Sequence, residues 1–484
     1  MRYRSFLRSD SAGFRRFWMM TAIGTGAFLS HFTAGVVHVS LPYLAEVFHT
    51  NLDTAQWITT GYLLVIALLL PIMGKLGDRY GHRRIHNIGF GLFTAASALI
   101  ALSPDLMALL GFRMLQAVGA AMFQATNIGL ITVHVPPERR GRALGTVSTA
   151  VALGAMFGPI AGGAIAEWLP WQWLFLLHVP VALIGTWLAI RYIPVRERER
   201  TPAQPDPVGA LLFIVSVGSG VIGLTNAQSQ GWFATGTVVF LSAVLPLLLL
   251  LLLWELRRPS PFLPVRALGI PAVGSGLILS CASFAMANIV LVTLPFYLSG
   301  EIGLSPSLIG GIMTAYPLLL AAAGPVAGHG SDVYGSRRFM LLGLGTMGGG
   351  FALFALYLNR LPLIGVTAVL ALIGLGMGLI ASPNNSYIMR HAPQTQVGAI
   401  GGMVALTRNL GMTFGAALGL GAMANPGQNP RTGEIPAAFG NGFLIAAAAL
   451  LIFGAGAYWE ARRNQSKATD IHNRNRRTRK EKLK

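Results

Sequence analysis

The sequence has 484 residues, of which 53% are hydrophobic and only 11% are charged, and its formal net charge is +19. Soluble globular domains carry about 25% charged residues, so this composition excludes an ordinary soluble protein and indicates a membrane protein with many spans. The basic excess is explained by membrane topology, and we expect no nucleic acid among the partners. Cys281 is the single cysteine, which excludes an intramolecular disulfide and a cysteine metal site. We expect neither a metal nor a cofactor.

Long apolar runs follow one another along almost the whole chain. A membrane-spanning helix needs roughly 20 mostly apolar residues. We expect Tyr316-Pro317 to break the tenth span and Pro383 to end the twelfth. The predicted fold class is therefore an all-α polytopic membrane protein with fourteen transmembrane helices. The predicted spans are 17–43, 54–73, 87–103, 106–130, 143–166, 172–193, 208–227, 234–254, 272–298, 307–328, 338–358, 362–382, 399–423 and 438–459.

Basic residues are distributed unevenly between the two sides of these spans. Arg360 and Arg431 lie in loops on one side, whereas most other Lys and Arg residues gather in the opposite loops and at the termini. Lys and Arg are retained on the cytoplasmic side of a membrane. We therefore expect both termini in the cytoplasm, with residues 1–16 as an uncleaved basic N-terminus. Residues 460–484 are expected to be a disordered basic tail, either attracted to membrane lipids or serving only as a solvated retention signal.

A short charged segment separates the second and third spans and returns later in the chain. Residues 74–84 combine Asp78, glycines that allow a tight turn and the closing pair Arg83-Arg84. Residues 328–338 repeat the Asp-x-x-Gly core, the tyrosine within it and the closing Arg-Arg. Two copies in equivalent settings indicate a duplicated membrane unit.

Both copies look like the signature loop of the major facilitator superfamily. The resemblance implies a cytoplasmic latch that holds one conformation through charge pairs and a helix N-terminus, with Asp78 as the acceptor. An orientation signal alone would explain the arginines, but not the aspartate or the glycine spacing. The expected latch residues are Gly74, Asp78, Arg79, Gly81, Arg83, Arg84, Asp332, Gly335, Arg337 and Arg338.

Eight predicted spans lie between the two copies, where a twelve-helix member of the superfamily has six. We therefore interpret the seventh and eighth spans as an inserted pair. The expected organisation is a six-helix bundle over 17–193, a linker with the two inserted helices over 194–270, and a second six-helix bundle over 271–459.

The first span resembles the fourteen-helix drug:proton antiporter branch of this superfamily. When the sequence pattern of this branch is aligned on Leu41-Pro42, Thr33 takes the position of the pattern's aspartate and His38 takes the position of its asparagine. A carboxylate in the membrane binds and releases protons, whereas threonine does not. His31 and His38 share a helix face and imidazole titrates in the useful range. His38 is our first candidate for the proton carrier, ahead of His31, although a lone membrane histidine is more often a packing residue; Glu46 is the nearest edge carboxylate.

The fourth span carries Arg113 and Gln116 in the Arg-x-x-Gln pattern of the superfamily. An unpaired guanidinium is costly inside a membrane. Arg113 either extends to the outer surface and bonds exposed carbonyls, or lines a water-filled path beside a titrating group. We prefer the path because Gln124 and Asn127 lie in the same span. The second unit adds three cavity candidates, namely Asn384, Asn385 and Arg408.

The fifth span contains a glycine-rich motif that resembles the one associated with exporting members of the superfamily. Gly154, Gly158 and Gly162 recur every four residues, Gly163 follows, and Pro159 removes one backbone donor. Such a stripe lets another helix approach closely. We expect it to be a hinge, with ordinary helix packing as the alternative, and we expect Gly158→Leu to impair transport more than Gly154→Ala.

Taken over residues 17–460, the resemblance implies a secondary active exporter of amphiphilic or cationic small molecules in a bacterial inner membrane. Because no nucleotide-binding loop is present, a gradient must drive transport, and the proton is the expected coupling ion. An uncoupled facilitator or exporter of lipid-like substrates is the alternative that Thr33 favours. A scaffold or sensor that transports nothing is the alternative from another class. We predict no enzymatic activity.

Overall fold

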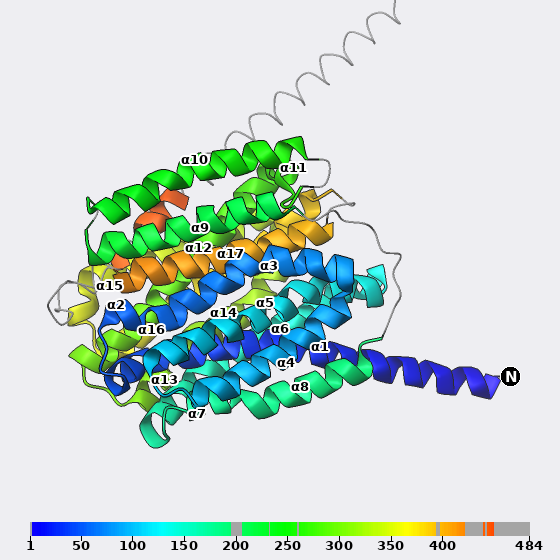
Figure 1. Ribbon diagram of the computed structural model, residues 1–484, viewed down its shortest axis with the longest axis horizontal. Coiled ribbons are helices and arrows are strands. Elements are labelled where there is room, and N and C mark those ends of the chain that lie inside the picture. Colours follow the sequence, from blue (N-terminus) through cyan, green and yellow to red (C-terminus); the bar gives the residue numbers. More distant parts are fainter. Residues whose placement is uncertain are drawn as a thin grey trace, which may run out of the picture.

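A computed structural model describes residues 2–194, 206–231, 233–258, 261–393, 397–421, 439–440 and 443–449. Over these ranges the chain is helical and contains no strand, which agrees with the all-α prediction. The long helices lie side by side along one common direction (Figure 1). Helices make most of their backbone hydrogen bonds internally, as the interior of a membrane requires.

Six long helices and two short ones form the first unit. They are α1 (Arg2–Val47), α2 (Leu52–Ala55), α3 (Trp57–Tyr80), α4 (His82–Ala101), α5 (Leu106–His134), α6 (Pro137–Trp168), α7 (Trp173–Leu176) and α8 (His178–Tyr192). The inserted segment contains α9 (Pro207–Ser229), α10 (Thr235–Arg257) and α11 (Val265–Leu268). The second unit contains α12 (Pro271–Phe296), η1 (Tyr297–Glu301), α13 (Pro306–Met313), α14 (Ala315–Tyr334), α15 (Ser336–Tyr357), η2 (Leu358–Arg360), α16 (Leu363–His391) and α17 (Val397–Gly421).

Within the described ranges, eleven helical stretches are long and apolar enough to cross a membrane. Two further predicted spans coincide with α4, of 20 residues, and α17, of 25 residues, in which glycine and polar residues dilute the apolar ones. The last predicted span, 438–459, falls mostly outside the described residues. The chain is therefore a polytopic helical membrane protein.

Two predicted helix breaks differ from the structure. The tenth span divides at Thr314, between α13 and α14, rather than at Tyr316-Pro317. Pro317 cannot donate to the carbonyl of Met313, so the break falls before the proline. Pro383 does not end its helix, because α16 continues to His391. Asn384 donates to the carbonyl oxygen of Gly276 at 2.9 Å, which holds this part of α16 against α12.

Each unit contains a seam of glycines that brings two helices into backbone contact. In each seam, three glycines spaced one turn apart on one helix contact three residues spaced one turn apart on a second helix. Residue numbers rise in the same direction along both helices. The paired residues are Gly154 with Phe28, Gly158 with Phe32 and Gly162 with Val36 in the first unit, and Gly411 with Cys281, Gly415 with Ala285 and Gly419 with Ile289 in the second. The helix pairs α1/α6 and α12/α17 are therefore parallel, and the repeat supports a duplicated unit.

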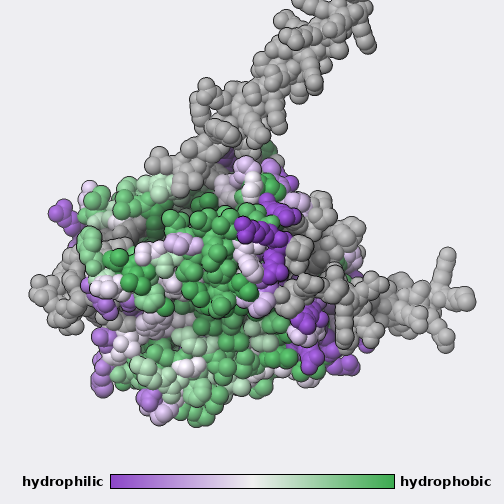
Figure 2. All heavy atoms as spheres, turned by 45° about the horizontal axis from the view of Figure 1, so that its top comes forward, coloured by the Kyte–Doolittle hydropathy of each residue, from purple (hydrophilic) through white to green (hydrophobic). Residues whose placement is uncertain are grey.

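The two units meet where α6 packs on α13 and α14, where α3 and α5 pack on α17, and where α1 packs on α12 and α13. A broad hydrophobic surface covers the middle of the bundle, and hydrophilic residues gather toward its ends (Figure 2). We call the end at which α3 and α14 finish the basic end, because Arg79, Arg83, Arg84, Arg337 and Arg338 lie there. The opposite end, at which α1 finishes and α13 begins, is the far end.

Candidate functional site

The two signature segments form the same tight turn at the basic end. Gly81 is the only residue between α3 and α4, and Gly335 is the only residue between α14 and α15. Their φ angles are +98° and +90°, which glycine adopts without the steric cost of a side chain. Each glycine N–H closes the preceding helix by donating to Gly77 at 2.9 Å or to Ser331 at 3.1 Å. The glycines therefore fix the geometry of both turns.

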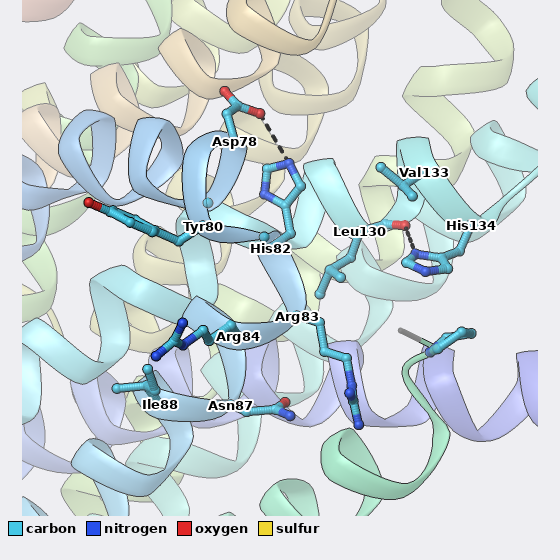
Figure 3. A pocket seen from close by; sticks show the side chains of 13 residues that line it. Asp78, Tyr80, His82, Arg83, Arg84, Asn87, Ile88, Leu130, Val133 and His134 are labelled. Atoms are coloured by element: carbon cyan, nitrogen blue, oxygen red, sulfur yellow. Dashed lines mark hydrogen bonds and ion pairs between the residues drawn. The ribbon is translucent and has the colours of Figure 1, made fainter. Parts of the chain in front are cut away.

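Asp78 pairs with a histidine rather than with an arginine. Nε2 of His82 lies 3.1 Å from the carboxylate of Asp78, and this is the one ion pair found within the described ranges. Arg83 and Arg84 point away from the carboxylate (Figure 3). Glycines at 77 and 129 flank the His82 ring closely. An open pocket of about 550 Å³ lies beside the turn. Its lining includes Gly77, Asp78, His82, Arg83, Arg84, Asn87 and His134.

Two cations of the segment bind backbone carbonyls that are distant in the chain. Arg83 donates to the carbonyl oxygen of Ile190, at the end of α8, at 2.7 Å. Lys75 donates to the carbonyl oxygen of Pro261 at 2.7 Å and lies 5.6 Å from the centre of the Phe262 ring. The segment therefore ties α3 and α4 to α8 and to the inserted segment.

The inserted helices are held together at the same end by two carboxylates. Asp206 caps α9 through the N–H of Gly209 at 2.9 Å and accepts from the indole of Trp254 on α10 at 3.0 Å. Glu255 is fully buried and accepts from the N–H of Leu263 at 3.2 Å. The bonds of Asp206 and Glu255 lie within the insertion, and Lys75 attaches this end of it to the first unit.

Arg113 is buried inside the first unit and does not extend to the surface. Only 1% of the residue is exposed. Its guanidinium donates to Thr33 at 2.9 Å, to the carbonyl oxygen of Ile58 at 3.3 Å and to Gln116. The ring of Tyr62 stacks beneath it at 3.9 Å. Gln116 in turn donates to Ser97 at 2.7 Å, so α1, α3, α4 and α5 share one polar network.

Thr33 therefore stands where a carboxylate would neutralise Arg113. A hydroxyl accepts the hydrogen bond but leaves the positive charge in place. The imidazole of His38 lies within electrostatic range of Arg113, is 5% exposed, and has no hydrogen-bond partner for Nε2 among the described residues. The structure therefore places the first candidate for the proton carrier beside the network of Arg113.

The other cavity candidates occupy different surroundings. In the first unit, Gln124 donates to Ser30 at 2.5 Å, Asn127 is buried, and Glu46 is exposed where α1 approaches its end. His31 lies nearer the centre of the molecule, where Nδ1 donates to the carbonyl oxygen of Ala27 at 3.0 Å. In the second unit, Asn385 is exposed, whereas Asn384 is bound to α12 as described above.

The glycine motif of α6 contacts both units. A Cβ atom at position 158 would lie 2.8 Å from the carbonyl oxygen of Phe32, and one at 154 would lie closer still to that of Phe28. Gly163 faces the other way, against Gly310 and the backbone of Pro306 on α13. Nearby, Glu167 accepts from the N–H of Ser307 at 2.9 Å. The motif thus joins α6 to α1 on one face and to the second unit on the other.

The sequence pattern that defines the Major Facilitator Superfamily matches residues 23–287 and again residues 276–482. The chain belongs to the major facilitator superfamily. The first match includes most of the first unit, the inserted segment and the start of α12, and the second begins within α12. The protein is therefore a multi-pass membrane transporter of this superfamily, as its sequence predicted.

Relatives in the superfamily carry several transport functions. The riboflavin transporter RibZ of Clostridioides difficile is 30% identical over 82% of this chain and 86% of its own length. The tetracenomycin C resistance and export protein of Streptomyces glaucescens is 29% identical over 82% of this chain and 74% of its own. The multidrug resistance protein Stp of Mycobacterium tuberculosis is 28% identical over the same shares. The predicted drug-efflux branch is confirmed by these export and resistance proteins.

Solved structures of a peptide transporter, POT, share the fold. The complex of POT with sulfate superposes with a TM-score of 0.68 over 92% of this chain and 94% of that chain, at 19% sequence identity. This likeness supports the arrangement of the helices and carries no information on substrate.

Three residues that make these contacts were not predicted from the sequence. His82 lies within the quoted signature segment, and its i, i+4 spacing from Asp78 could have identified it as a partner. Lys75 also lies in that segment, but its acceptor is a distant backbone carbonyl. Gly310 could have been noticed only as part of a Gly-Gly pair, since its close neighbour belongs to the other unit.

We expect Asp78→Asn to lower transport severalfold while membrane insertion and abundance stay nearly unchanged. The carboxylate is largely exposed and holds His82 rather than filling a core, so its loss disturbs the turn more than the fold. Asp332→Asn should have a milder effect. The measurement is flux per amount of inserted protein. If both variants transport at the rate of the wild type, the latch role is wrong.

Proposed function

We propose that the protein is a secondary active exporter of amphiphilic small molecules, coupled to protons and working by alternating access of its two units. The observation that carries this proposal is the pair of duplicated units, each with its own parallel glycine seam, in a chain whose relatives include resistance and export proteins. Close backbone contact lets each helix pair move as one body.

The charges inside the bundle favour uncharged or anionic substrates over cationic ones. Arg408 lies near the middle of α17 and Arg113 lies about two turns inside α5, whereas every Asp and Glu in the described helices lies at the end of a membrane span or outside it. A cationic compound would meet positive charge without a compensating carboxylate. The expected substrates are therefore amphiphiles without a net positive charge.

The proton is proposed to bind at His38, beside the network of Arg113. The basic end, with its two turns, is proposed to face the cytoplasm of a bacterial cell, because cytoplasmic loops are rich in Lys and Arg. An uncoupled facilitator is the second candidate, and the threonine at position 33, which cannot carry a proton, favours it.

Purified protein in liposomes with an imposed pH gradient tests this function. The flux of riboflavin, of the anionic dye fluorescein and of the cationic dye pyronin Y is followed in each direction of the gradient. An antiporter accumulates a substrate against the substrate's concentration gradient when the pH gradient is imposed. A facilitator only equilibrates the substrate, and a scaffold moves none of the three, which would overturn the proposal.

A further inference from the structure

Arg408 lies near the centre of the transporter, at the contact between the two units. It falls near the middle of α17, which packs against α12 and against α3 and α5 of the first unit. Its guanidinium lies 5.9 Å from the centre of the Phe284 ring, near the middle of α12, and within electrostatic range of His31, near the middle of the first span. Substrate sites of such transporters lie near the bilayer midplane, where the repeated units meet.

The guanidinium of Arg408 has fewer partners in the described residues than that of Arg113. Arg113 is bonded to three acceptors and stacked on Tyr62, whereas Nε of Arg408 is buried without a hydrogen-bond partner among the described residues. No carboxylate pairs with Arg408 in the described ranges. The sequence between Asp332 and Glu434, which contains α15, α16 and α17, has no other acidic residue. Arg408 is half-buried. A cation near the middle of a membrane-spanning helix with no carboxylate partner among the described residues indicates that a ligand supplies the partner.

The neighbourhood offers acceptors in addition to this cation. Because Nδ1 of His31 donates to a carbonyl, Nε2 of the neutral ring is an acceptor. Asn288, one turn beyond Phe284, donates to the carbonyl oxygen of Met412 at 2.6 Å, one turn beyond Arg408, and its own oxygen has no partner among the described residues. The region therefore presents one positive group, one aromatic face and two acceptors.

We propose that Arg408 binds an acidic group of the transported molecule, so that the preferred substrates are flat amphiphiles bearing a carboxylate or a comparable anion. The anion forms a charge-assisted hydrogen bond with the guanidinium, and the ring system of the substrate packs against Phe284. A hydroxyl or N–H of the substrate donates to Nε2 of His31. This inference rests on the proposed function, whose substrate class it narrows.

The test compares fluorescein with pyronin Y, two xanthene dyes of opposite charge. Binding of each dye to the full-length transporter in neutral phosphatidylcholine nanodiscs is measured by fluorescence anisotropy. We expect wild type to prefer fluorescein and Arg408→Gln to weaken fluorescein binding by roughly 10- to 100-fold, the range that a lost hydrogen bond to a charged group produces. Arg408→Lys should lose less, because it keeps the charge. Arg360→Gln, at the exposed η2 turn, is the matched control.

Three outcomes would overturn the anion site. They are a wild-type preference for pyronin Y, equal fluorescein binding by wild type and Arg408→Gln, and fluorescein binding that anionic phosphatidylglycerol in the nanodisc suppresses in wild type but not in Arg408→Gln. The last outcome would assign Arg408 to a lipid headgroup. Proton-driven flux of pyronin Y with no fluorescein binding would leave the exporter function standing and remove only this site. Folding of each variant is checked by size-exclusion chromatography.

Discussion

Gly158→Leu is expected to reduce transport at least about 10-fold while the protein still reaches the membrane. A Cβ atom at this position would already lie 2.8 Å from the carbonyl oxygen of Phe32, and backbone cannot move aside as a flexible side chain can. Overpacking of a close contact typically costs about 1–3 kcal/mol, and here it would separate α1 from α6. Flux per amount of folded protein and the melting temperature are measured together.

The same substitution at Gly111 is the matched control. Gly111 lies on α5 with nothing within 4 Å of its Cβ position, so Gly111→Leu should transport normally. The sequence predicts that Gly154→Ala impairs transport less than Gly158→Leu. Because the structure places Gly154 closer to the backbone of α1 than Gly158, we expect a clear loss of transport in Gly154→Ala as well. If flux falls only in proportion to the melting temperature, the contact between α1 and α6 is ordinary helix packing and not a hinge. Normal flux in Gly158→Leu would contradict the close seam itself.

His38→Ala is expected to abolish the response to a pH gradient while substrate binding stays within about twofold of wild type. The imidazole is buried, has no partner for Nε2 among the described residues and lies within electrostatic range of Arg113. Imidazole is the one group on this part of α1 that titrates near neutral pH. The measurements are gradient-driven flux and equilibrium binding on the same preparation.

Substitutions of two other histidines distinguish an effect on proton coupling from an effect on substrate binding. His391→Ala, at the exposed end of α16, should leave both quantities unchanged. His31→Ala should keep the response to the gradient and alter only the affinity for substrate. If His38→Ala keeps proton-driven transport, Glu46 becomes the next candidate, and a wild type that ignores every pH gradient would support the uncoupled facilitator.

The helices were predictable because a span requires a long apolar run, and the two turns were predictable because positive φ requires glycine at a fixed place. The partners of Arg113 were predictable only in part. Gln116 follows it by one turn, but Thr33, Ile58 and Tyr62 come from other helices whose rotation depends on the glycine seams.

The central site was less accessible to sequence analysis. Arg408 was predicted as a cavity residue, yet its neighbours His31 and Phe284 are far away in the chain. The α12/α17 register that brings Arg408 to Phe284 depends on Gly411 and Gly415 lying on the α12 backbone. The continuation of α16 through Pro383 likewise depends on contact with α12, which local proline rules do not include.

The inserted helices make the two sides of the transporter unequal. In the described part of the chain, α9 packs on both α3 and α17 and so covers one edge of the contact between the units. At the other edge α6 meets α13, and Phe157, Ile160 and Leu308 remain exposed there. Over the described ranges, the edge formed by α6 and α13 is therefore the one that the inserted helices leave facing the bilayer.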